Sequence, residues 1–143
     1  MGWSSCWSIR HVAFVAGLGT FGISGGLITR RGIAHRLGCV VTAAEIAPTP
    51  RAYGDDPFAW CLWTSRGTCG QCIQRCPAAS VGQGHAQRDK LACREQNRRI
   101  RLDSKNLYGE EGLYGCGLCQ TGVPCEFGVP EGLTTSNEPP AQR

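Results

Sequence analysis

The chain has few of the residues that build a large hydrophobic core. Among its 143 residues, Leu, Ile, Val and Phe together number 28, and aromatic residues make up only 8%. Glycine and proline together account for another 28 residues. A chain this poor in apolar side chains usually needs disulfides or metal in addition to hydrophobic burial. The length allows one domain, or one small domain with an appended segment.

A long apolar run is also lacking. Residues 12–29 carry no charge, but they include five glycines and the polar residues Thr20, Ser24 and Thr29. A transmembrane helix needs about 20 predominantly apolar residues. The N-terminal residues likewise lack the basic region and apolar core of a secretory signal peptide. We therefore expect no membrane span and no secretion.

Cysteine, in contrast, is abundant, with ten copies. Cys69, Cys72 and Cys76 have the spacing C-x2-C-x3-C and precede Pro77. This is the second half of the bacterial ferredoxin run C-x2-C-x2-C-x3-C-P. Five more cysteines follow or flank this group: Cys61, Cys93, Cys116, Cys119 and Cys125. Eight thiolates are what two four-iron clusters require.

Metal ligation explains these cysteines better than disulfides do. Adjacent C-x2-C pairs close loops too short to gain much as disulfides, but they place two sulfurs on one metal centre. Because such thiolates must stay reduced, we expect a cytoplasmic location. The formal charge of +4 ignores the thiolates. Two clusters with their ligands would bring it close to zero, so it does not indicate a nucleic-acid partner.

The ferredoxin pattern also predicts how the cysteines are shared. In two-cluster ferredoxins, the cysteine before the proline ligates the other cluster. Applied to this chain, the pattern assigns Cys61, Cys69, Cys72 and Cys125 to a first [4Fe-4S] cluster. It assigns Cys76, Cys93, Cys116 and Cys119 to a second. Gly70 and Gly117 each follow the first cysteine of a C-x2-C pair, and we expect them to let the backbone approach the cluster.

Structural zinc is the alternative for the cysteines. Cys69 and Cys72 with Cys116 and Cys119 would form a four-cysteine zinc site. That assignment leaves four other cysteines and Pro77 without a role. Cys6 and Cys39 lie outside both sets and are expected to be small buried residues or free thiols. His85 is interpreted as a loop histidine, and His11 and His35 indicate no site by themselves.

The glycine-rich segment at residues 17–22 reads GxGxxG, which is also a dinucleotide-binding pattern. Strands at residues 11–16 and 39–45 would flank it, with Glu45 on the ribose. Gly25 and Gly26 argue against the crossover helix, since each costs about 1 kcal/mol relative to alanine. The simpler interpretation is a turn that packs a helix against a neighbouring sheet.

The remaining elements are expected as follows. A helix covers residues 8–16, a short helix or strand 27–29, and a strand 37–42. Residues 48–57 form a connector and the domain boundary. Asp89 caps a helix at residues 90–102. Four arginines spread around that helix, and they form either a solvated face or a docking surface for an acidic electron-transfer partner: Arg94, Arg98, Arg99 and Arg101.

Several segments resemble a known family. Residues 8–11, 16–22, 27–29 and 38–42 resemble the late part of the epoxyqueuosine reductase-like proteins, which are relatives of the reductive dehalogenases. Residues 68–77, the Gly84-His85 pair, Cys93 and residues 116–125 resemble the two-cluster ferredoxin domain appended in that family. Arg66 stands where the family has its first cysteine, and Cys61 is taken as its substitute. The last group ends Val123-Pro124-Cys125 rather than Cys-Pro.

The resemblance implies an α+β fold in three parts. Residues 1–50 would be the C-terminal remnant of a cobalamin-binding, nitroreductase-like domain. Residues 51–133 would be a small, loop-rich, helical ferredoxin-type domain with two [4Fe-4S] clusters, and residues 134–143 a flexible tail. The family's proton donor and most of its cobalamin contacts would precede residue 1, so cobalamin is expected only with that upstream domain.

The function that follows is electron transfer to a reductase active site. The partner would be a redox protein or the upstream catalytic domain, with neither nucleic acid nor membrane involved. One alternative is the C-terminal part of a cobalamin-dependent reductase, and another is a zinc-held interaction module. Whether the chain is itself an enzyme stays open.

Overall fold

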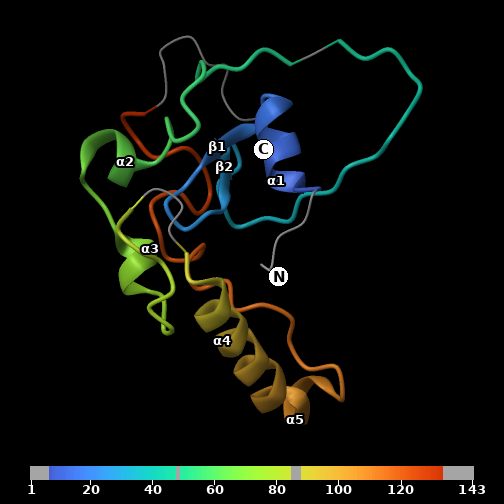
Figure 1. Ribbon diagram of the computed structural model, residues 1–143, viewed down its shortest axis with the longest axis vertical. Helices are drawn as coiled ribbons and strands as arrows, with labels where there is room; N and C mark the ends of the chain where they lie inside the picture. Colours follow the sequence, from blue (N-terminus) through green and yellow to red (C-terminus); the bar gives the residue numbers. More distant parts are fainter. Residues whose placement is uncertain (1–6, 48, 85–87, 134–143) are drawn as a thin grey trace.

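The computed structural model describes residues 7–47, 49–84 and 88–133. The elements in chain order are α1 (Ile9–Val15), β1 (Gly19–Phe21), β2 (Leu27–Thr29), α2 (Leu62–Arg66), α3 (Gln71–Gln74), α4 (Lys90–Asp103) and α5 (Lys105–Tyr108). In Figure 1, α1 lies beside the β1–β2 hairpin, and α4 projects away from them at the opposite end of the molecule. Helices with one small antiparallel sheet are compatible with the expected α+β class. The nitroreductase-like and ferredoxin-like designations stay predictions.

The glycine-rich segment joins α1 to an antiparallel hairpin. Gly17 adopts a φ of +78°, which favours glycine, and its amide donates to the carbonyl oxygen of Phe14 at 3.0 Å. β1 then pairs with β2, with Thr20 opposite Ile28. A dinucleotide site needs a parallel strand reached through a crossover helix. The GxGxxG alternative is therefore wrong, and the helix expected at residues 8–16 is confirmed as α1. Residues 27–29, expected as a short helix or strand, form the strand β2.

The hydrophobic core joins the hairpin to the cysteine-rich segment. Ile28 and Ile33 from the hairpin region pack with Trp60 and Val123, and all four are buried. The Oγ1 of Thr20, a residue with no exposed surface, accepts a hydrogen bond of 3.0 Å from the amide of Trp60. The core thus contains residues from both sides of the boundary expected near residue 50, and the division into domains stays a prediction.

The strand expected at residues 37–42 is wrong. These residues have no regular secondary structure, and Val40 and Val41 are 90% and 89% exposed. They belong to a long loop that runs away from the hairpin (Figure 1). β-Branched residues favour a strand when neighbouring strands and side chains cover them. No such neighbour covers these valines.

Helix α4 begins where the sequence predicts. The carboxylate of Asp89 accepts hydrogen bonds of 2.9 Å from the amides of Leu91 and Ala92, which satisfies two of the free donors of the first turn. None of the residues in α4 is fully buried. Among the described residues, no helix has the length and apolar character needed to cross a membrane.

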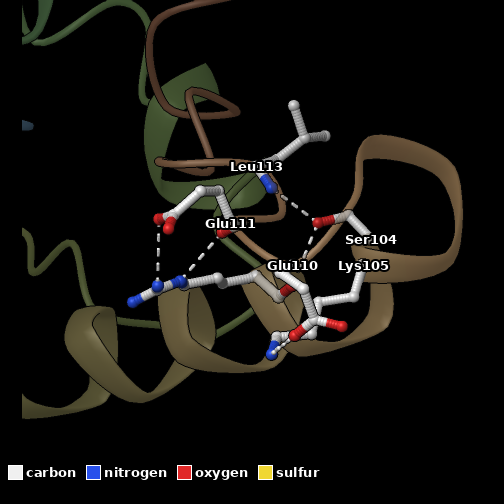
Figure 2. A network of polar contacts seen from close by, with 6 residues as sticks. Ser104, Lys105, Glu110, Glu111 and Leu113 are labelled. Atoms are coloured by element: carbon white, nitrogen blue, oxygen red, sulfur yellow. Dashed lines mark hydrogen bonds and ion pairs between the residues drawn. The ribbon is translucent and has the colours of Figure 1, made fainter.

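A polar network folds the chain back after α4 (Figure 2). The Oγ of the buried Ser104 accepts a hydrogen bond of 2.7 Å from the amide of Leu113 and donates one of 3.1 Å to the carbonyl oxygen of Arg101. Arg101 also donates to the carbonyl oxygen of Glu111 at 2.9 Å. An exposed ion pair of 3.3 Å joins Lys105 to Glu110. The network directs the following loop, which carries Cys116, back along the helix.

Candidate metal centres

Two cavities lie in the cysteine-rich part of the molecule, and four cysteines line each of them. We call the cavity lined by Cys61, Cys69, Cys72 and Cys125 the first site. The cavity lined by Cys76, Cys93, Cys116 and Cys119 is the second site. These are the two groups of four that the ferredoxin pattern predicts. The assignment of the cysteines as cluster ligands is not tested by this geometry and stays a prediction.

The first site lies against the hydrophobic core. Ile23, Ile28 and Val123 contribute to its wall, and in the described part of the chain no charged side chain lines it. Cys61 is 7% exposed and directly precedes α2. Cys125 is held from the other side, because its carbonyl oxygen accepts a hydrogen bond of 2.8 Å from the amide of Ile33. Segments far apart in the sequence therefore meet at this site.

Two thiols of the first site have raised pKa values, and neighbouring cysteines contribute to both increases. Burial raises the pKa of Cys125 to about 12, and the neighbouring Cys61, Cys72 and Cys69 add to the increase. Burial likewise raises the pKa of Cys72 to about 11, and Cys61, Cys69 and also Cys119 of the second site add to the increase. Four thiolates could not share this apolar site unless a cationic group compensated their charge.

The space inside the first site is small. Its volume is about 30 Å³, which is room for little more than a water molecule. The thiol set suits a four-iron cluster, but the apolar wall would have to move outward to admit one. The second site needs no such movement, since its volume is about 650 Å³.

The second site is polar as well as large. His35, Arg36 and Arg88 line it together with the amide side chains of Asn97 and Gln120. Among the described residues, the buried Nδ1 of His35 has no hydrogen-bond partner.

Hydrogen bonds fix the thiols of the second site. The amide of Ser80 donates to the Sγ of Cys76 at 3.2 Å, and the Ser80 hydroxyl lies 3.1 Å from the same sulfur. Burial alone would raise the pKa of Cys76, but hydrogen bonds from Ser80 and from the backbone of Ala78 and Val81 together outweigh it, and the pKa is lowered. Burial raises the pKa of Cys119, and the charge of Arg88 opposes the increase.

Asn97 joins two of these cysteines. It lies one turn after Cys93 on α4, and its Nδ2 donates to the carbonyl oxygen of Cys93 at 2.8 Å. Its Oδ1 accepts a hydrogen bond of 2.7 Å from the amide of Cys116. The sequence analysis did not single out Asn97. Its spacing of four residues from Cys93 on a helix is the signal that could have found it.

Arg88 is the second residue that the sequence analysis missed. Its Nη2 donates to the Sγ of Cys93 at 2.6 Å, and its Nη1 donates to the carbonyl oxygen of Ser24 at 3.3 Å. Arg88 precedes Cys93 by five residues and is separated from Ser24 by 64 residues. No local sequence pattern marks it.

The two C-x2-C loops share one backbone feature. Gly70 and Gly117, which follow the first cysteine of each pair, have φ values of +86° and +70°. Both are left-handed conformations that favour glycine. Arg75 links the two loops by donating from its Nε to the carbonyl oxygen of Leu118 at 3.2 Å. The two glycines thus share a left-handed conformation, and their expected close approach to a cluster stays a prediction.

The four cysteines of the zinc alternative divide between the two cavities. Cys69 and Cys72 line the first site, whereas Cys116 and Cys119 line the second. Within residues 7–47, 49–84 and 88–133, no three His, Cys, Asp or Glu side chains are close enough to hold one metal ion. This applies to the four cysteines of each site as well as to the zinc set.

Cys6, Cys39 and His85 lie outside the two proposed ligand sets. Cys39 is an exposed free thiol, as expected, and the other described cysteines are also unpaired. Cys6, His85 and the tail at residues 134–143 lie outside the described residues.

Comparison with known proteins adds no relative. No protein-family model matches the sequence, and neither a curated protein nor a solved structure is significantly similar to it.

Proposed function

We propose that this chain holds two [4Fe-4S] clusters and transfers electrons to a reductase active site. The observation that supports the proposal most directly is that eight cysteines line two cavities in two sets of four. The division agrees with the ferredoxin pattern, which was read from the sequence alone. A bound [4Fe-4S] cluster supplies one-electron chemistry, and the protein supplies position and tuning.

The two sites would surround a bound cluster with different side chains. At the first site, Ile23, Ile28 and Val123 provide an apolar wall beside the thiols. At the second site, Ser80 and Asn97 hold the thiols and the backbone around them by hydrogen bonds. Such contacts orient ligands and adjust the properties of a metal centre.

The partner we propose is a redox protein or an upstream catalytic domain, in a reducing cytoplasm. The arginines on α4 do not single out a docking surface. Arg98 and Arg99 form ion pairs with Glu95 at 2.9 and 3.4 Å, and Arg101 pairs with Glu111 at 3.4 Å. Because acidic residues of the same chain neutralise part of this charge, the arginines fit a solvated face better. The cobalamin-dependent alternative stays a prediction.

Anaerobic reconstitution with ferrous iron and sulfide tests the proposal. The full chain should become brown, bind about eight iron and eight sulfide ions, and give a low-spin EPR signal after reduction with dithionite. Cys39→Ser is the matched control and should keep the full iron content, because Cys39 is exposed and lies outside both sites. Binding of about four irons or fewer without that EPR signal would overturn the two-cluster proposal, and a colourless protein with stoichiometric zinc would replace it with the zinc module.

A further inference from the structure

Arg88 lies between the two sites. Its Nη2 donates to the Sγ of Cys93, which lines the second site, at 2.6 Å. Its Nη1 donates at 3.3 Å to the carbonyl oxygen of Ser24, which lines the first site. The side chain is half-buried. One guanidinium therefore contacts a thiol of the second site while anchored on the wall of the first.

The backbone of Arg88 is fixed as well. Arg88 forms an isolated antiparallel bridge with Val81, which is 2% exposed. The amide of the following residue, Asp89, donates to the carbonyl oxygen of Ser80 at 2.8 Å. Ser80 in turn contacts the sulfur of Cys76. Arg88 is thus held both at its backbone and at its guanidinium, unlike a long side chain that moves freely at the surface.

A fixed positive charge at this position acts on the two sites unequally. Reduction adds one negative charge to a cluster, and a cation within hydrogen-bonding distance of a ligand sulfur stabilises that charge. Arg88 also interacts electrostatically with Cys119, a second thiol of the same site. At the first site, no charged side chain lines the cavity in the described part of the chain. The hydrogen bond from the Ser80 amide to the Sγ of Cys76 acts in the same direction as the charge.

We propose that Arg88 is a tuning residue that holds the reduction potential of the cluster at the second site above that of the cluster at the first. This inference rests on the proposed function, because both sites must hold clusters for their potentials to differ. The contact with Ser24 positions the guanidinium, and the contact with Cys93 transmits its effect.

Potentiometric titration of the reconstituted full chain, followed by EPR, tests the inference. Arg88→Met removes the charge and retains most of the side-chain length, and Arg88→Lys retains the charge. Arg36→Met is the matched control, because Arg36 also lines the second site but donates to the carbonyl oxygen of Tyr114, at 3.4 Å, rather than to a thiol. A Cys72→Ser background, in which only the second site is expected to be filled, assigns the two signals.

We expect Arg88→Met to make the second cluster harder to reduce. At a fixed ambient potential, its ratio of reduced to oxidised form should fall about tenfold, which corresponds to about 59 mV for one electron. The first cluster should titrate as in the unmodified chain. Arg88→Lys should restore most of the change, and Arg36→Met should cause a smaller one.

Unchanged potentials in Arg88→Met, or an equal change in both clusters, would overturn the inference. If Arg88→Met does not retain iron, Arg88→Gln provides the same test, because it removes the charge and keeps a hydrogen-bond donor. Iron is counted before each titration. A failure of the unmodified chain to bind two clusters therefore contradicts the proposed function and is distinguished from a failure of the role given to Arg88.

Discussion

The amide of Ile33 donates a hydrogen bond of 2.8 Å to the carbonyl oxygen of Cys125. This bond joins the segment after the β1–β2 hairpin to the last cysteine of the first site. Gly32 makes the approach possible. It has a φ of +89°, and a Cβ at this position would overlap the carbonyl oxygen of Glu126.

We expect Gly32→Ala to destabilise the protein by about 3 kcal/mol, since both a left-handed backbone conformation and a steric overlap are imposed on alanine. Gly25→Ala is the matched control. Its φ is +76°, but no atom lies within 4 Å of the added Cβ. The control should lose only about 1 kcal/mol, the cost of the backbone conformation. Urea denaturation measures both, and equal losses would show that the close approach to Glu126 is not restrictive.

Substitution of single cysteines should separate the two clusters. We expect Cys72→Ser to deplete the cluster of the first site and Cys119→Ser that of the second, because the two thiols line different cavities. EPR of the reduced proteins and iron counts measure the losses. Cys39→Ser and Cys6→Ser should lose neither cluster. Depletion of the same cluster by both loop variants would contradict the assignment of the ligands.

The Ser104 network should stabilise the loop that carries Cys116 to the second site. Ser104→Ala leaves the amide of Leu113 without its acceptor and removes a donor from the carbonyl oxygen of Arg101. Unpaired buried groups of this kind cost about 1–3 kcal/mol. We expect unfolding at lower urea concentration and weaker retention of the second cluster, because the loop carrying Cys116 is held less firmly.

Lys105→Ala provides the control for Ser104→Ala. It removes an exposed ion pair of 3.3 Å with Glu110, and such pairs contribute about 0–1 kcal/mol. Its stability and iron content should stay close to those of the unmodified protein. Similar losses in the two variants would show that the buried hydroxyl has no special role.

Removal of the clusters should loosen α4 selectively. No residue of this helix is fully buried, and Cys93 and Asn97 are its links to the second site. We expect trypsin to cleave within α4 after Arg98 and Arg99 much faster in the metal-free protein. Cleavage after Arg31, beside the hairpin, should change far less because the hydrophobic core remains. Mass spectrometry of the fragments follows both, and an equal acceleration at the two places would contradict a local role for the cluster.

Local sequence patterns predicted the parts of the structure that depend on local chemistry. Asp89 was identified as a helix cap from its type and position, and it accepts hydrogen bonds from two amides of the first turn. The spacing of the cysteines predicted two groups of four, and four line each cavity. Cysteine spacing predicts such groups because the ligands of one metal centre must lie close together in the folded chain.

Non-local packing was not predictable in the same way. Val40 and Val41 have strand-forming side chains, but no neighbouring strand pairs with them in the described structure. Arg88 donates a hydrogen bond to the carbonyl oxygen of Ser24, which is distant from it in sequence. A single sequence carries no pattern that reveals such a pair.

The thiols of the first site come from three separate stretches of chain, at Cys61, at the Cys69–Cys72 loop and at Cys125. During translation, Cys125 emerges from the ribosome long after Cys61. The set is therefore incomplete until synthesis has passed the last cysteine, and the nascent chain must keep its earlier thiols reduced in the meantime. Under the proposed function, loading of this site would therefore have to wait until Cys125 has been synthesised.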